Sequence, residues 1–248
     1  MLKRPNGDDV AVRSFSWRNM KILVDAKMSD KVRSSLSLCG EVISLPKWRG
    51  LPEPVSSHPD MLFYPLPNGK ILVGGDYYNE NRDFFSSLGD LFVLDEKTPS
   101  GSYPFDVLFD CLGVKDTLYG KDGFVSDRIK ENYSFFVPVK QGYARCSVAM
   151  LSDSCAVTAD RGIAAALKND GIDVLLIRSG YIELKGYDGG FIGGAGAYLG
   201  DGVYGFFGDL YSHPDGKAIA EFADKHKIKA VSLSDDTLSD NGGLLILQ

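Results

Sequence analysis

Histidine is scarce in this 248-residue chain, which has only three, and the signals of a membrane or an export pathway are missing. No apolar run approaches the roughly 20 residues of a membrane span. Residues 1–20 carry charges throughout and contain no apolar core of a signal peptide. We therefore predict a cytoplasmic protein that does not associate with membranes.

Cysteine pairs and basic clusters are missing as well. Cys39, Cys111, Cys146 and Cys155 form no Cys-x-x-Cys pair, which favours free thiols in a reducing compartment and argues against zinc. The net charge is −6 and the pI about 5.1, so nucleic acid is a poor partner. The glycine-rich stretch 187–202 runs into a strand instead of opening a helix, which argues against a dinucleotide site. We expect no metal and no cofactor.

A helix-then-strand pattern is present and recurs five times. The helices are predicted to begin at capping-type residues, and three of them to end at glycines that tolerate a left-handed conformation. The predicted caps are Ser29, Asn79, Ser126, Thr158 and Ser212, and the closing glycines are Gly40, Gly89 and Gly171. The strands that follow are predicted to begin at Glu41, Asp90, Ser134, Ile172 and Ile228. Their spacing of roughly 40–55 residues indicates a repeat architecture.

Additional strands are predicted before four of the helices, so the unit is strand, strand, helix, strand. The predicted pairs are DMLFYPL and KILVGG, FDVLFDCLGV and DTLYG, SVAMLSD and CAVT, and GFIGGAGAYL and GVYGFFG. The first unit lacks a leading strand, whereas the chain ends in an unpaired one, DNGGLLILQ. If this last strand joins the first unit, it closes a ring of five units without open edges. Residues 1–19 are then a flexible extension, and residues 20–248 a single domain.

This repeat order resembles the pentein superfamily, the α/β five-bladed propellers that include arginine and agmatine deiminases, dimethylarginine dimethylaminohydrolase and amidinotransferases. It is most similar to an uncharacterised bacterial subgroup that lacks the C-terminal Cys. The resemblance implies carboxylates that hold a guanidinium group, a His followed two residues later by an acid for proton transfer, and a nucleophilic Cys near the C-terminus. His58-Pro59-Asp60 fits the second element. The third is missing, because Gly242-Gly243 is followed by aliphatic residues and Gln248.

The period also predicts which residues meet at the axis of the ring, namely those at the start of each unit's first strand. They are His58 to Asp60, Phe105-Asp106, Cys146-Ser147, Gly189-Gly190 and Asp240-Asn241. We predict a polar central pore that binds a small polar molecule. Its predicted catalytic residues are His58, Asp60 and Cys146, the last as a replacement nucleophile. Its predicted ligand-binding residues are Asp106, Asp240, Asn241 and His213. The alternative is that these polar residues mark solvated strand ends and that Cys146 is a buried core residue.

The tetrapeptide Ser-His-Pro-Asp occurs twice, at 57–60 and at 212–215. In the second copy Ser212 is predicted to cap a helix, with Pro214 in its first turn. The first copy is predicted to precede a strand, where no cap explains it.

Two functions follow as hypotheses. The first is a hydrolase or transferase that acts on a C–N bond of a guanidino- or amide-like substrate. The second is a non-catalytic protein of the same fold that binds a metabolite or a protein partner.

Overall fold

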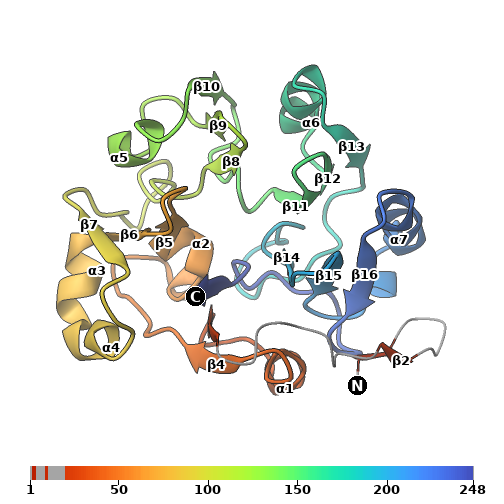
Figure 1. Cartoon of the computed structure of the whole chain (residues 1–248), viewed down its shortest axis with the longest axis horizontal. Helices are drawn as coiled ribbons and strands as arrows, with labels where there is room; N and C mark the ends of the chain where they lie inside the picture. Colours follow the sequence, from red (N-terminus) through yellow and green to blue (C-terminus); the bar gives the residue numbers. More distant parts are fainter. Residues whose placement is uncertain (1, 4–8, 11–19, 248) are drawn as a thin grey trace.

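The strands of the molecule are grouped into small sheets. The computed structural model describes residues 2–3, 9–10 and 20–247. Over these residues it contains five three-stranded sheets and one two-stranded ribbon (Figure 1). In each three-stranded sheet the middle strand pairs antiparallel with one neighbour and parallel with the other. Figure 1 shows the five sheets arranged around a common centre with their longer helices on the outside.

Four of the sheets are built from consecutive strands. They are β5 (Phe63–Pro65), β6 (Ile71–Gly74) and β7 (Phe92–Asp95); β8 (Leu112–Val114), β9 (Thr117–Gly120) and β10 (Phe135–Pro138); β11 (Val148–Ser152), β12 (Cys155–Thr158) and β13 (Asp173–Leu176); and β14 (Gly196–Tyr198), β15 (Val203–Phe206) and β16 (Lys229–Ser232). The remaining sheet joins the two ends of the chain, because β17 (Leu245–Leu247) pairs antiparallel with β3 (Lys21–Val24), which pairs parallel with β4 (Glu41–Ser44).

Helices connect the parallel strands of each sheet, because parallel strands cannot be joined by a tight turn. They are α1 (Asp30–Leu36), α3 (Gly75–Glu80) with α4 (Arg82–Ser86), α5 (Asp127–Lys130), α6 (Arg161–Asn169) and α7 (Gly216–Lys225). Shorter segments are η2 (Glu53–Val55), α2 (Pro59–Leu62) and η3 (Leu210–Ser212). None of these helices is long and apolar enough to cross a bilayer, as far as the structure describes the chain.

The apolar core lies between neighbouring sheets. One cluster joins Ile22 and Val24 of β3 to Val203 of β15 and Val231 of β16, so the first and last units share buried side chains. Another packs β3 against the β5–β7 sheet through Leu23 and residues such as Phe63 and Val73. The sheet of β3 thereby packs against the β14–β16 sheet on one side and the β5–β7 sheet on the other.

The N-terminal ribbon pairs β1 (Leu2–Lys3) with β2 (Asp9–Val10), and β1 lies beside β16. The prediction of a flexible extension over residues 1–19 concerns mostly residues that lie outside the described part of the chain.

The strands that follow the helices begin within two residues of the predicted positions, whereas several predicted helix starts are wrong. Ser29 does cap α1, and its side chain accepts a hydrogen bond from Val32 N. Asn79 lies inside α3, which already begins at Gly75. Thr158 ends β12, and Asp160 caps α6 by accepting from Ile163 N at 2.8 Å. Thr158 and Asp160 are both residue types that cap helices, so the sequence pattern did not show which of the two caps α6.

Ser212 was also wrongly predicted as the cap of the fifth long helix. It ends η3, and α7 begins four residues later at Gly216 with Asp215 as its N-cap residue. The first Ser-His-Pro-Asp copy, predicted only to precede a strand, also begins a helix before β5: Pro59 is the first residue of α2 and His58 occupies its N-cap position. Both copies therefore lead into a helix, but from different positions of the tetrapeptide, and a proline in a first turn favours a helix at the first copy.

Three predicted leading strands and the closing strand start too early. β5 begins at Phe63 and not at Asp60, β8 at Leu112 and not at Phe105, β14 at Gly196 and not at Gly190, and β17 at Leu245 and not at Asp240. Asp110 N donates to Val107 O, and Ala195 N donates to Ile192 O, so turns precede β8 and β14. The residues predicted at the starts of first strands therefore lie before them, in loops or, for Asp60, in α2.

Candidate functional site

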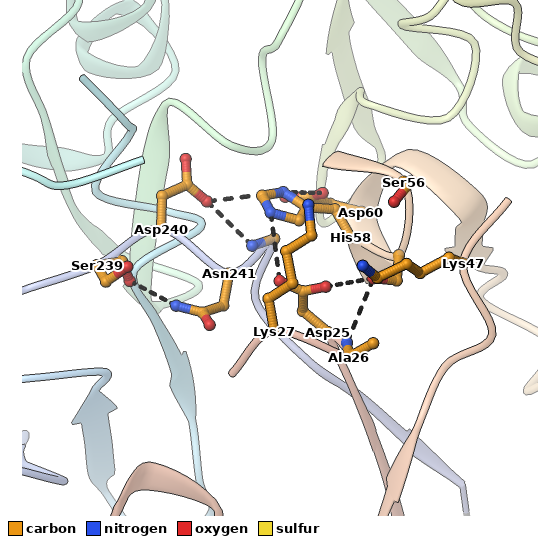
Figure 2. A network of polar contacts seen from close by, with 12 residues as sticks. Asp25, Ala26, Lys27, Lys47, Ser56, His58, Asp60, Ser239, Asp240 and Asn241 are labelled. Atoms are coloured by element: carbon orange, nitrogen blue, oxygen red, sulfur yellow. Dashed lines mark hydrogen bonds and ion pairs between the residues drawn. The ribbon is translucent and has the colours of Figure 1, made fainter. Parts of the chain in front are cut away.

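His58 is buried at the centre of a group of carboxylates. Its ring Nε2 is 3.7 Å from Asp25 Oδ2, and its Nδ1 is 4.0 Å from Asp60 Oδ1 and 3.9 Å from Asp240 Oδ1. These distances are too long for hydrogen bonds. Nε2 has no hydrogen-bond partner among the described residues. Figure 2 shows the ring between Asp240 on one side and Asp60 on the other, with Asp25 close by.

Each carboxylate reaches this group from a different element. Asp25 follows β3 directly and accepts a hydrogen bond from Ser57 Oγ. Asp60 lies in the first turn of α2, and its backbone N–H donates to Gly242 O. Asp240 precedes β17 and accepts from Phe191 N at 2.9 Å and from Gly242 N at 3.0 Å. The loop before the last strand therefore holds two of the acids in place through its backbone.

Glycines make room for these side chains. A Cβ added at Gly194 would lie 1.9 Å from Asp240 Oδ1, and one at Gly190 would lie 2.4 Å from Asp240 Cβ. Gly242 has φ +67°, and a Cβ there would lie 2.5 Å from His58 Cβ. A larger residue at these positions would displace the acids or the histidine.

Cys146 lies behind Asp60 and adds a thiol to the group. Its Sγ donates to Asp60 Oδ2 at 2.7 Å, and its backbone N donates to Asp110 Oδ1 at 2.9 Å. Arg145 N also donates to Asp110 Oδ1, at 2.8 Å. Asp110 is fully buried. Asp60 of α2 and Asp110, in the loop before β8, thus both contact Cys146.

Burial and mutual repulsion shift the pKa values of these groups. Loss of solvation, and then the charge of Asp60, raise the pKa of Asp110 to about 8. Burial raises the pKa of the Cys146 thiol well above its ordinary value, and Asp110 and Asp60 add to this shift. Burial also raises the pKa of Asp240 to about 6, against the opposing attraction of His58. Binding of a proton or another cation would therefore stabilise these buried acids.

Two cavities reach the group. We call the first the His58 cavity: its volume is about 520 Å³, and its lining includes Asp25, His58, Asp240, Asn241, Lys27 and Lys185. The second is the Asp60 cavity, about 530 Å³, whose lining includes Asp60, Arg145, Val148, Gly193 and Gly242. Cys146 lines neither of them. A ligand in the His58 cavity would meet the histidine and two acids directly.

The structure brings together four of the seven residues predicted for the site: His58, Asp60, Cys146 and Asp240. Asn241 lines the His58 cavity, and its side chain donates to Ser239 O. Asp106 is buried, but it accepts a hydrogen bond from Tyr143 Oη at 2.7 Å, and burial raises its pKa.

His213 lies elsewhere, beside Arg178 and Tyr181. Its Nδ1 accepts from Asp215 N, its Nε2 faces the Arg178 carbonyl at 3.2 Å, and burial lowers its pKa. Nothing places it in contact with the group around His58.

Sequence reasoning missed Asp25 and Asp110. Asp110 stands in the apolar run FDVLFDCLGV, where a single charge among residues that should be buried was the available signal. Asp25 follows the apolar strand KILV, and an acid at such a strand end was equally visible. The predicted site was limited to the start of each unit's first strand, which leaves out Asp110, farther along that run, and Asp25, in a unit for which no leading strand was predicted.

Comparisons with known proteins place the fold. Residues 23–245 match the model of a family described as "Family of unknown function (DUF6873)". No curated protein matches the sequence. Among solved structures, the chain is similar to SxtG, an amidinotransferase of the saxitoxin pathway from Microseira wollei, with 9% identity, coverage of 94% of this chain and 96% of that one, and a TM-score of 0.54.

Two further solved structures give the same result. A dimethylarginine dimethylaminohydrolase (DDAH) from Pseudomonas aeruginosa has 8% identity, coverage of 89% and 93%, and a TM-score of 0.55. Agmatine deiminase from C. jejuni has 10% identity, coverage of 89% of each chain, and a TM-score of 0.52. These likenesses show the pentein fold, as the sequence repeat predicted.

Proposed function

The chain belongs to the DUF6873 family and has the pentein fold, and we propose that it is a hydrolase or transferase that acts on a C–N bond of a small guanidino- or amide-like substrate. The substrate group binds in the His58 cavity, next to Asp25 and Asp240. The solved structures with this fold include a protein named as an amidinotransferase and one named as an agmatine deiminase, which supports this substrate class.

The charge of the site supports a cationic, planar ligand. Asp25, Asp60 and Asp240 surround one histidine, and all are buried. A guanidinium group brings one positive charge and several N–H donors, which carboxylates accept in charge-assisted hydrogen bonds.

The observation that carries the proposal is the chain of contacts from Cys146 Sγ to Asp60 and from Asp60 to His58. In the proposed reaction Asp60 takes the thiol proton, and the sulfur attacks the guanidinium carbon. The C–N bond then breaks, and the leaving amine receives a proton from His58. Water or a second amine releases the product from the sulfur.

A second candidate is a non-catalytic protein that binds the same ligand. It is favoured by the position of Cys146, which lines neither cavity and whose raised pKa keeps the thiol protonated. In that case the histidine and acids bind a metabolite without turnover.

One screen separates the two candidates. The protein is incubated with guanidino and amide compounds, and thermal shift reports binding while ammonia or amine release reports turnover. If the enzyme proposal is correct, Cys146→Ser abolishes release, His58→Gln strongly reduces it, and at least one of the two variants still shows the shift. Binding without release by the wild type would establish the second candidate, and neither binding nor release would contradict both.

We also propose that the five sheets form a closed ring and that residues 20–248 fold as one domain. Support comes from the pairing of β17 with β3 and from the core shared by the first and last units. Removal of residues 244–248 deletes the buried Leu245 and Leu247 and should lower the free energy of unfolding by at least about 4 kcal/mol. Removal of residues 1–19 should leave the urea midpoint nearly unchanged. An unchanged midpoint in the first truncation would contradict ring closure.

A further inference from the structure

Three possible metal ligands meet in the core beside the proposed substrate site. Ligand atoms of Asp60, Asp110 and Cys146 all lie within 4.8 Å of one another, and all three residues are buried. Tetrahedral coordination separates neighbouring ligand atoms by about 3.3–3.8 Å, as follows from metal–ligand bonds of 2.0–2.3 Å. The three side chains could therefore surround one ion after small rotations.

Each of the two carboxylates in this cluster has one oxygen that accepts no hydrogen bond. Asp60 Oδ1 and Asp110 Oδ2 are buried and have no hydrogen-bond partner among the described residues. The other oxygen of Asp110 accepts two backbone N–H groups, which orient the carboxylate. An unpartnered buried carboxylate oxygen costs free energy unless a cation satisfies it. The cluster thus has a fixed ligand with a free lone pair.

We propose that Asp60, Asp110 and Cys146 bind a divalent transition-metal ion of the zinc class. The thiolate selects Zn²⁺ or Co²⁺ over Mg²⁺ and Ca²⁺, which prefer oxygen ligands alone. Binding releases the thiol proton and any proton held by the carboxylates to the solvent. This departs from the expectation of no metal, which rested on Cys-x-x-Cys spacing and so could not detect ligands that are far apart in sequence.

The Asp60 cavity provides a path for the ion and a place for a fourth ligand. Asp60 lines this cavity of about 530 Å³, so a water molecule could complete the coordination from that side. Arg145, the basic residue whose charge acts on Asp110, donates from its guanidinium to the Phe63 carbonyl at 3.0 Å. Two carboxylates and a thiolate oppose this one positive charge, so the cluster still favours a cation.

Cobalt substitution tests the site without any need for activity. The full chain is freed of metal with a chelator, kept reduced, and titrated with Co²⁺. We expect a near-ultraviolet thiolate-to-cobalt charge-transfer band that saturates at one equivalent and is displaced by Zn²⁺ but not by Mg²⁺. Cys146→Ser should abolish the band, and the matched variant Cys155→Ser, which replaces another buried thiol, should retain it.

Carboxylate variants extend the test if a cysteine variant folds poorly. Asp110→Asn keeps an oxygen for the two backbone donors and should weaken Co²⁺ binding at least tenfold, as should Asp60→Asn. Circular dichroism checks that each variant is folded. The proposal is overturned if the wild type gives no band, if the band survives in Cys146→Ser, or if both carboxylate variants bind Co²⁺ as tightly as the wild type. A bound ion would occupy Cys146 and Asp60, so turnover through Cys146 is expected only in the metal-free protein. The band is read without turnover, so its loss says nothing against the proposed function.

Discussion

The two Ser-His-Pro-Asp segments have the same sequence but opposite environments. In the first, the ring nitrogens of His58 face three carboxylates at 3.7–4.0 Å, and none of them is a hydrogen-bond partner. In the second, His213 accepts from Asp215 N at Nδ1 and faces the Arg178 carbonyl at Nε2. Both rings are buried. Only the first histidine has ring nitrogens left for a ligand.

The aspartates differ in the same way. Asp215 binds Arg178 with both carboxylate oxygens, and this ion pair lowers its pKa to about 2. Asp60 contacts a thiol and a histidine and has no basic partner of this kind. The second segment is satisfied by the residues around it, whereas the first is left with unpaired polar atoms. Such a deficit is what a binding or catalytic site requires, and a tetrapeptide alone does not reveal it.

The largest expected effect is on turnover. With a guanidino compound identified by the screen, His58→Gln should reduce the rate of ammonia or amine release by a factor of about 10² to 10⁴, because a proton-transfer group is lost. His213→Gln should stay within about twofold of the wild type. Equal losses in both variants would show that the contrast between the two segments is not functional.

Gly242 tests how tightly the first segment is packed. Gly242→Ala should lower the free energy of unfolding by about 2–4 kcal/mol, because it adds strain at φ +67° and a Cβ 2.5 Å from His58 Cβ and 2.7 Å from Asp60 Oδ1. Gly69→Ala is the matched control, since Gly69 has φ +82° and nothing within 4 Å of an added Cβ. Urea unfolding of both variants separates crowding from backbone strain. Similar losses of unfolding free energy in the two variants would show that crowding around His58 and Asp60 does not contribute.

The pH dependence of ligand affinity should come from the first segment's surroundings. Asp240 is neutral below its pKa of about 6 and charged above it, so it attracts a guanidinium cation only at the higher pH. Affinity should rise by about tenfold between pH 5 and pH 7, measured by calorimetry. Asp215→Asn should leave this profile unchanged, because Asp215 carries its charge throughout that range. A flat wild-type profile would contradict the role of Asp240.

The smallest effect is expected in the second segment. Arg178→Ala breaks a partly exposed ion pair and should lower the free energy of unfolding by less than about 1 kcal/mol. Asp215 has a lowered pKa, so its contribution to stability is present above pH 4 and is lost as the pH falls towards 2. Thermal unfolding should show a smaller acid-dependent loss in the variant than in the wild type, because only the contribution of Asp215 is removed.

Local patterns predicted some features of the molecule well and others poorly. The strands that follow the helices begin close to the predicted residues, because a short apolar run bounded by turn residues is visible locally. Helix starts at Asn79, Thr158 and Ser212 were wrong, since several residues near each start could cap a helix. Asp110 was missed because its contact with Cys146 is made across 36 residues. No local pattern encodes such a contact.

The sequence by itself determined the order of elements and the repeat that indicates the pentein fold, because hydrophobic periodicity and glycine turns act over a few residues. The tertiary structure decided which polar groups meet. It brought Cys146 to Asp60 across 86 residues and turned His58 towards three acids, while it gave His213 hydrogen-bonding neighbours. Burial then shifted the pKa values of Asp110, Cys146 and Asp240, and burial is a property of the packed chain and not of any segment.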